Sequence, residues 1–165
     1  MKSPSIWLHI RDILILPGLV CVAIPYALHN VLSSIIPHDL IFKSIGGSIF
    51  GIGLLLWAYP VYLFITIGKG TLAPWVPTQK LIITGPYRYC RNPMITGILF
   101  ILVGEGLFLG SIGILLWAAW FFFMNTNYFH FIEEPGLVKR FGEDYMRYKK
   151  NVPMWIPRFT PYKPD

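Results

Sequence analysis

Residues 44–67 read SIGGSIFGIGLLLWAYPVYLFITI, a run without a single charged side chain. A helix needs about 20 mostly apolar residues to cross the hydrocarbon core of a bilayer. Three further apolar runs are present, at about 13–37, 94–109 and 111–132. We therefore predict an all-α integral membrane protein with about four transmembrane helices, built as a single membrane domain over residues 1–165.

The composition excludes several other classes of protein. Of the 165 residues, 55% are hydrophobic and 13% are charged, whereas about a quarter of a soluble domain is charged. A soluble fold of this length would expose large apolar patches, and an aromatic content of 16% excludes a disordered chain. Cys21 lies in an apolar run and Cys90 in a basic loop, so a disulfide scaffold is excluded as well.

The distribution of basic residues predicts the orientation. Of the 14 lysines and arginines, only Lys43 falls in a loop on the far side of the predicted spans. The others precede the first span, lie between the second and third, or follow the fourth. Cytoplasmic loops carry such an excess, so we predict a multi-pass protein with both termini in the cytoplasm. The net charge of +6 thus indicates contact with membrane lipids and not with nucleic acid.

Glycines and the C-terminal residues suggest how the spans pack. Gly47 and Gly51, and likewise Gly106 and Gly110, have the small-x-x-x-small spacing of close helix contacts. Only Gly110 separates the third and fourth spans, which predicts a tight helical hairpin.

Beyond the fourth span, an apolar stripe at helical spacing predicts an amphipathic cytoplasmic helix from about Pro135. The stripe consists of Val138, Phe141, Tyr145 and Tyr148.

Residues 152–157 are again apolar and contain two prolines. Such a segment either lies on the lipid surface or folds back over the mouth of the helical bundle. We expect it to fold back, so that residues 133–165 form a cytoplasmic segment at the end of the bundle.

A first polar cluster lies in residues 85–93, GPYRYCRNP. Arg88 and Arg91 are three residues apart and would face one way on a helix. The planar guanidinium fork matches a carboxylate or a phosphate. The cluster is either a ligand site or an interfacial anchor for lipid headgroups.

A second polar cluster ends the fourth span. Helical spacing places Asn127, His130 and Glu134 on one face, with Glu133 close to His130. Two carboxylates at the C-terminal end of a helix oppose its dipole, so they call for a ligand or an arginine partner. Arg88, Arg91 and Arg140 are the candidate ion-pair partners. One histidine with two carboxylates does not predict a metal site. A further carboxylate, Glu105, is expected at the far membrane interface.

These motifs resemble the isoprenylcysteine carboxyl methyltransferase family and its phospholipid N-methyltransferase relatives. The resemblance covers about residues 80–158. It rests on an Arg-His-Pro-x-Tyr-x-Gly segment entering one helix, here residues 91–97, and on a Glu-Glu pair ending the next, here Glu133 and Glu134. Asn92 replaces the family histidine and can still form hydrogen bonds, whereas Ile95 replaces the tyrosine and loses its ring and hydroxyl. Matching positions continue along the chain at Leu137, Phe141, Gly142, Tyr145, Tyr148, Val152, Pro153 and Pro157.

The resemblance implies a membrane methyltransferase that uses S-adenosylmethionine and methylates a lipidic or otherwise hydrophobic acceptor, such as a prenylated one. The carboxylate of S-adenosylmethionine suits an arginine, its ammonium and ribose suit a glutamate, and its adenine suits an aromatic ring. The expected cofactor-binding residues are Tyr87, Arg88, Arg91, Pro93, Gly97, Glu133, Glu134 and Trp155. The resemblance also implies that the folded-back segment 133–165 covers the cofactor, because a group-transfer site must exclude water. The expected catalytic residues are Arg91, Asn92, His130 and Arg140, with His130 as the proton acceptor if the methylated atom is an amine or thiol.

Two alternatives stay open at this stage. One is a membrane reductase of the sterol reductase type, which would bind NADPH. The other is a non-enzymatic membrane scaffold or a small transporter. The residues also leave open the identity of the acceptor, the choice between O-, N- and S-methylation, the oligomeric state, and which of the two adjacent glutamates contacts the cofactor.

Overall fold

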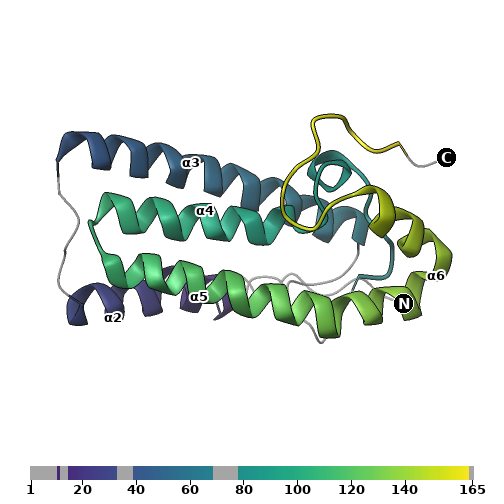
Figure 1. The fold of residues 1–165 in the computed structure, drawn as a ribbon, viewed down its shortest axis with the longest axis horizontal. Helices are drawn as coiled ribbons and strands as arrows, with labels where there is room; N and C mark the ends of the chain where they lie inside the picture. Colours follow the sequence, from purple (N-terminus) through teal and green to yellow (C-terminus); the bar gives the residue numbers. More distant parts are fainter. Residues whose placement is uncertain (1–10, 12–14, 33–38, 69–77, 164–165) are drawn as a thin grey trace.

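A computed structural model describes residues 11, 15–32, 39–68 and 78–163. Its regular elements are all helical within these ranges. Figure 1 shows α3, α4 and α5 lying side by side, with α2 against α5. In chain order the elements are η1 (Leu19–Ala23), α2 (Ile24–Val31), α3 (Leu40–Leu63), η2 (Phe64–Gly68), η3 (Gly85–Arg88), α4 (Pro93–Phe108), α5 (Ile112–Tyr128), η4 (Phe129–Glu133) and α6 (Glu134–Asn151).

Two of these helical stretches are long and apolar enough to cross a membrane, Leu40–Gly68 and Ile112–Asn151. Two shorter apolar helices, Ile15–Val31 and Pro93–Phe108, lie beside them. The first long stretch begins four residues before the predicted span, because the Asp39 side chain caps the helix by accepting from Phe42 N at 3.0 Å. The all-helical prediction is confirmed for the described residues, whereas the number of membrane crossings stays a prediction.

Close contact between α3 and α4 depends on four glycines. A Cβ on Gly46 would lie 2.7 Å from Gly104 O, and a Cβ on Gly53 would lie 2.9 Å from Gly97 O. Glycine spacing of seven residues on each helix therefore lets the two backbones touch. The expectation for Gly47 and Gly51 was wrong. Gly47 meets only the Phe108 side chain, at 3.8 Å, and Gly51 has nothing within 4 Å, since both lie one residue or more off the contact line.

The predicted hairpin between α4 and α5 is present. Gly110 turns the chain with a φ of 63°, and Ser111 N donates to Gly106 O at 2.8 Å. Gly106 itself faces Leu115 of α5. Glu105 lies near this turn and lines a cavity of about 360 Å³ with residues of α3.

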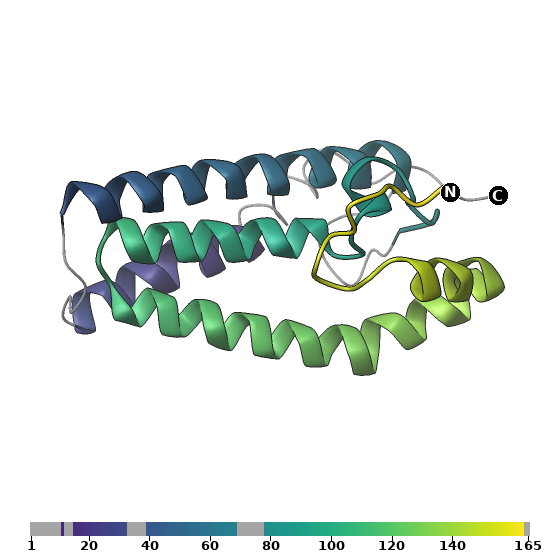
Figure 2. The same ribbon diagram turned by 45° about the horizontal axis from the view of Figure 1, so that its top comes forward.

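The helix that contains the fourth predicted span does not end at residue 132. α5, η4 and the first part of α6 form one helical path as far as Phe141, and this path bends along its length in Figure 2. η4 is a π-helical turn that ends two residues before Pro135, and η1 stands in the same relation to Pro25. A proline ring clashes with the carbonyl of the preceding turn, and a π-turn shifts those hydrogen bonds by one residue. The helix therefore continues through Pro135, where the sequence predicts the start of a separate helix.

α6 packs on the segment that precedes α4. Its apolar residues Tyr145 and Tyr148 join Val152 in a buried cluster, with Leu81 and Ile83 against it. The path of α6 is broken at Gly142, whose φ of 55° and ψ of −129° are not helical.

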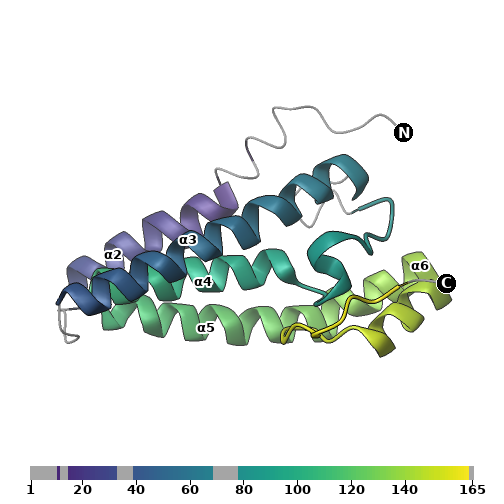
Figure 3. The same cartoon turned by 90° about the horizontal axis from the view of Figure 1, so that it is seen from above.

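The C-terminal segment folds back and runs alongside residues 88–91, whereas its role as a cover for a cofactor stays a prediction. Arg91 N donates to Pro153 O at 2.9 Å, Arg158 N to Tyr89 O at 3.0 Å, and Tyr162 N to Arg88 O at 2.9 Å. Figure 3 shows this segment crossing the end of the bundle where α6 lies, opposite the α4–α5 turn.

Candidate functional site

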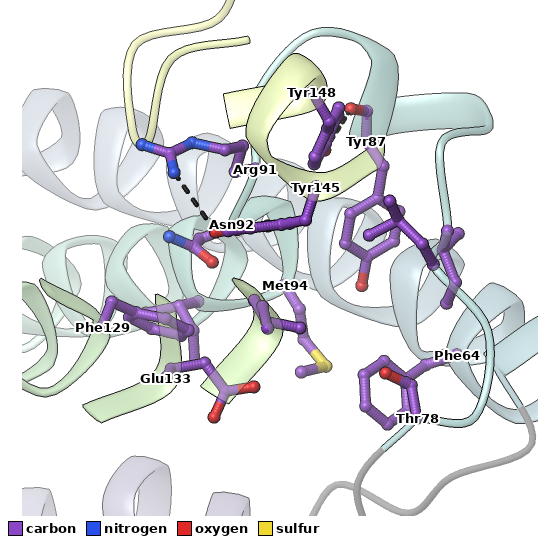
Figure 4. Close-up of a pocket in the computed structure, with 14 residues that line it drawn as sticks. Phe64, Thr78, Tyr87, Arg91, Asn92, Met94, Phe129, Glu133, Tyr145 and Tyr148 are labelled. Atoms are coloured by element: carbon purple, nitrogen blue, oxygen red, sulfur yellow. Dashed lines mark hydrogen bonds between the residues drawn. The ribbon is translucent and has the colours of Figure 1, made fainter. Parts of the chain in front are cut away.

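A cavity of about 110 Å³ lies at the α6 end of the bundle. Figure 4 shows its walls, which come from the ends of several elements. Its lining residues are Phe64, Thr78, Leu81, Ile82, Tyr87, Arg91, Asn92, Met94, Ile95, Phe129, Glu133, Leu137, Tyr145 and Tyr148. Most of the wall is apolar or aromatic, with one arginine, one carboxylate and one amide among the polar groups.

Arg91 and Glu134 form a buried ion pair beside this cavity. Their side chains are 10% and 4% exposed, and Arg91 Nη1 donates to Glu134 Oε1. The other carboxylate oxygen lies 2.6 Å from Lys149 Nζ. Arg91 Nη1 also lies 3.3 Å from the Tyr145 hydroxyl, the contact drawn in Figure 4. The pair is thus held from both sides by residues of α6.

Buried tyrosines support the same segment. Tyr148 Oη donates to the carbonyl of Tyr87 at 2.6 Å, which ties α6 to η3 just before Arg91. Burial raises the pKa of Tyr87 and of Tyr148. Burial, and next the charge of Glu134, raise the pKa of Tyr145. These hydroxyls therefore stay protonated at neutral pH. The Tyr148 hydroxyl donates to the Tyr87 carbonyl, whereas the Tyr145 hydroxyl accepts from Arg91 Nη1.

Glu133 has a different environment from Glu134. It lines the cavity, lies 3.5 Å from Arg140 Nη2, and accepts from Tyr128 Oη at 3.4 Å. Arg140 Nη1 also donates to Thr78 O at 3.1 Å, so Arg140 links α6 to the segment that forms the opposite wall. The two adjacent glutamates thus have separate arginine partners.

The remaining residues of the family-like motif divide between the cavity and the helix packing. Asn92 lines the cavity, and its backbone carbonyl accepts from Thr96 at the start of α4. Pro93 is the buried first residue of α4. Gly97 touches the backbone of Trp57, so its place is in the α3–α4 contact and outside the cavity wall.

Two predicted site residues, Arg88 and Trp155, lie outside the cavity lining. Arg88 Nε donates to Tyr162 O at 2.7 Å, so Arg88 and Arg91 do not face one way. The segment is a short 3₁₀ turn followed by a bend, and not the helix that the spacing argument assumed. Trp155 packs on Phe122 and Phe129, with ring centroids 5.3 and 5.9 Å apart, outside the cavity lining.

The predicted shared face of His130 and Glu134 is also absent. Glu134 is buried, whereas His130 is exposed and contacts only the ring of Phe131 among the interactions described. The π-turn between residues 129 and 133 adds one residue to the helical turn, which changes the face on which each side chain lies.

Sequence reasoning missed Tyr145 and Lys149 as neighbours of the ion pair. Both lie on α6, where the sequence analysis placed Tyr145 in the apolar stripe and gave Lys149 no role. Their spacing of four residues was the available signal, because it places them on one side of a helix. Among the described residues, no group of histidine, cysteine and carboxylate side chains could hold a metal ion.

The site lies in the part of the chain that comparison with known proteins identifies. The sequence model of the family described as phospholipid methyltransferase matches residues 42–144. The chain belongs to the phospholipid methyltransferase family. This range contains Arg91, Asn92, Glu133 and Glu134, and family membership together with the long apolar helices identifies a membrane protein.

Two curated relatives extend the comparison. Over 83 residues the chain is 34% identical to the protein-S-isoprenylcysteine O-methyltransferases of Mus musculus and Rattus norvegicus. The match covers 48% of this chain and 28% of each relative, so the chain corresponds to less than a third of their length. The resemblance read from the motifs is thereby confirmed at the level of the family. No solved structure matches the chain significantly.

Proposed function

We propose that this protein is an S-adenosylmethionine-dependent methyltransferase that works in the membrane on a lipidic or hydrophobic acceptor. The observation that carries the proposal is the buried Arg91–Glu134 ion pair beside a cavity, within the range matched by the family. We assign Arg91, Glu133 and Glu134 to the end of the cofactor that carries its carboxylate and ammonium.

The residues present fit that end of the cofactor. Arg91 Nε is buried and has no hydrogen-bond partner among the described residues, so it can still donate to a carboxylate. Glu133 lines the cavity and can accept from an ammonium, whereas Glu134, whose two oxygens face Arg91 and Lys149, fixes the guanidinium at that end. Small-molecule sites commonly have volumes of about 300–1,000 Å³. The cavity bounded by the described residues has a volume of about 110 Å³, so it has space for only part of the cofactor. Residues 69–77, which connect two parts of the wall at Phe64 and Thr78, lie outside the described residues.

When bound, the cofactor supplies a methyl group activated by its sulfonium. The protein then has to align the acceptor with that methyl group and exclude competing water. Arg91 and the glutamates would orient the cofactor, while the aromatic and aliphatic wall keeps the site dry. Asn92 lies at the polar edge of the cavity, where its amide can hold the acceptor in place.

Proton transfer depends on the acceptor. A carboxylate acceptor needs no base. If an amine or thiol is methylated, Glu133 is a better-placed proton acceptor than His130, because Glu133 lines the cavity and His130 does not. The proposal therefore assigns no step to His130.

A second cavity supports a lipidic acceptor. It has a volume of about 530 Å³, is lined by apolar side chains of α3, α4 and α5, and includes Phe122. Phe122 contacts Trp155, which contacts Phe129 in the wall of the first cavity. This series of rings connects an apolar space between the helices to the polar site, which suits an acceptor with a hydrocarbon chain and a reactive polar end.

Titration of the purified protein in nanodiscs tests the proposal. We expect saturable binding of S-adenosylmethionine and none of NADPH. Arg91→Ala and Glu134→Gln should each weaken binding at least tenfold, because removal of one partner of a desolvated charge pair commonly costs about 2–5 kcal/mol. Arg147→Ala and Glu143→Gln are matched controls, since both residues are exposed on α6.

Unchanged affinity in both site variants would contradict the assigned site. Binding of NADPH instead would favour a reductase, and binding of neither molecule would favour a scaffold. Incubation with membrane lipid extract and a cofactor carrying an isotopically labelled methyl group, followed by mass spectrometry, would then identify the acceptor and the methylated atom.

A further inference from the structure

The folded-back C-terminal segment presents large apolar side chains to its surroundings. Ile156 is 80% exposed and Phe159 is 104% exposed, the highest values for large apolar residues on this segment. Exposure of such large apolar side chains to water is unfavourable relative to burial. A protein that orders a segment in this way commonly has something that covers it.

The segment that carries these exposed side chains is held in place by hydrogen bonds. The backbone of the segment is joined to residues 88–91 by three hydrogen bonds, and Arg158 Nη1 donates to Asn151 O at 2.9 Å. Tyr162 packs on Tyr148, with ring centroids 6.2 Å apart. The residues on both sides of Phe159 are therefore fixed to the bundle.

The exposed apolar residues continue the exposed apolar surface of the long helix. Trp155, next to Ile156, lies against Phe122 and Phe129 at the α6 end of the long helix. On that helix Phe123 is 57% exposed and Phe131 is 68% exposed. Aromatic residues at the ends of membrane helices typically lie at the membrane–water boundary, which places Ile156 and Phe159 near that level.

Basic residues accompany this apolar surface. Between Glu134 and Lys163 the chain has seven basic residues and three acidic ones. Lys150 and Lys163 are exposed, and the Tyr148–Tyr162 contact brings the ends of their two segments together. Exposed aromatic and aliphatic groups next to lysines are the combination that binds anionic lipid surfaces.

We propose that residues 155–163 form an interfacial anchor, which inserts Ile156 and Phe159 into an anionic lipid surface beside the bundle. The anchor is joined through Pro153 and Arg158 to the backbone of residues 89–91, so the lipid surface helps to hold the segment that carries Arg91. The inference does not depend on methyl transfer.

Site-specific fluorescence tests the anchor directly. Phe159→Cys and, separately, Ile156→Cys would be made in a Cys21→Ala, Cys90→Ala background and labelled with an environment-sensitive dye. The proteins would be placed in nanodiscs of phosphatidylcholine alone or mixed with phosphatidylglycerol, with and without lipids brominated near the headgroup. Glu143→Cys, exposed on α6, is the control.

We expect blue-shifted emission and bromine quenching at positions 156 and 159, stronger with phosphatidylglycerol, and neither effect at position 143. Emission at 159 and 156 matching that at 143 would overturn the anchor. A blue shift without bromine quenching would also overturn it, because the side chains would then be covered by protein, such as a second copy. Equal quenching in both lipid mixtures would overturn the preference for anionic lipid.

Discussion

At the scale of single residues, Arg91 joins the ion-pair network to the C-terminal segment. Its guanidinium pairs with Glu134, and its backbone N–H donates to Pro153 O. Removing one partner of a buried pair leaves an uncompensated charge, which costs about 3–5 kcal/mol. Loss of cofactor binding in an Arg91 variant must therefore be compared with its folded fraction, for which the variants of exposed residues on α6 provide the reference.

Tyr148 allows a sharper test of how this segment is held. Tyr148→Phe removes the donor to Tyr87 O and leaves that carbonyl buried without its partner. We expect unfolding to be easier by about 1–3 kcal/mol, seen as a lower midpoint of thermal unfolding in detergent. Tyr62→Phe, at a tyrosine that is 61% exposed, should leave the midpoint unchanged. Equal midpoints for the two variants would mean that the Tyr148 hydrogen bond contributes little.

Cys90 predicts a dependence of stability on pH. Burial raises the pKa of its thiol from 9.0 to about 11, although hydrogen bonds involving Asn92 and Thr96 act in the opposite direction. The folded state thus favours the protonated thiol. This contribution is fully present below pH 9 and is lost as the pH rises toward 11. Cys90→Ala should flatten the fall in unfolding free energy across that interval, and an identical fall in the variant would exclude the thiol as a cause.

At the scale of elements, prolines and glycines decide how the helices run. η1 and η4 each end two residues before a proline, and the helix continues beyond both. In η1 the altered hydrogen bonding is accompanied by a contact between helices, since Val20 O accepts from Trp117 Nε1 of α5 at 3.1 Å. The prolines thus change the face of the helix on which the following residues lie, without ending the helix.

The α3–α4 contact gives a matched pair of glycine substitutions. A Cβ on Gly53 would lie 2.6 Å from Ile101 N, so Gly53→Ala must push two backbones apart. We expect a loss of about 1–3 kcal/mol, as is usual for overpacking, measured by unfolding of the purified protein. Gly51→Ala meets nothing within 4 Å and should stabilise its helix by roughly 0.5–1 kcal/mol. Destabilisation by both variants to the same degree would contradict the glycine contact.

At the scale of the whole molecule, the two ends of the bundle differ in charge and in content. The cavity, the ion pair and the folded-back segment lie at the α6 end, together with most of the basic residues. The opposite end contains the α4–α5 turn and the start of α3. If the bundle crosses the bilayer in the orientation that the basic residues predict, its polar site lies at the cytoplasmic surface, where a polar cofactor can enter.

Cysteine accessibility tests this orientation. Single cysteines at positions 80 and 160, in a background without Cys21 and Cys90, should react with a membrane-impermeant maleimide only after the cytoplasmic side is opened. A cysteine at position 40, beside Lys43, should react in intact cells. Labelling of positions 40 and 80 from the same side would contradict the predicted topology.

Residue types and short spacings in the sequence predicted much of the fold and part of the site. The lengths of the apolar runs predicted the helices, Gly110 predicted the hairpin, and the motif around Arg91 and Glu133–Glu134 predicted the family. The pairing of an arginine with these carboxylates was also foreseen as an alternative to ligand binding. Each of these depends on residue type and short spacing, which a sequence displays directly.

Tertiary structure alone decided which residues meet. The choice of Glu134 by Arg91 and of Glu133 by Arg140, and the exposure of His130, depend on the phase of a helix that a π-turn shifts by one residue. Arg88 instead reaches the Tyr162 carbonyl because its segment forms a 3₁₀ turn and the C-terminal segment folds back beside it. The use of Gly46 and Gly53 instead of Gly47 and Gly51 depends on how α3 packs against α4. Regular 3.6-residue spacing cannot reveal such a shift, because it arises from proline sterics and from packing against elements far away in the sequence.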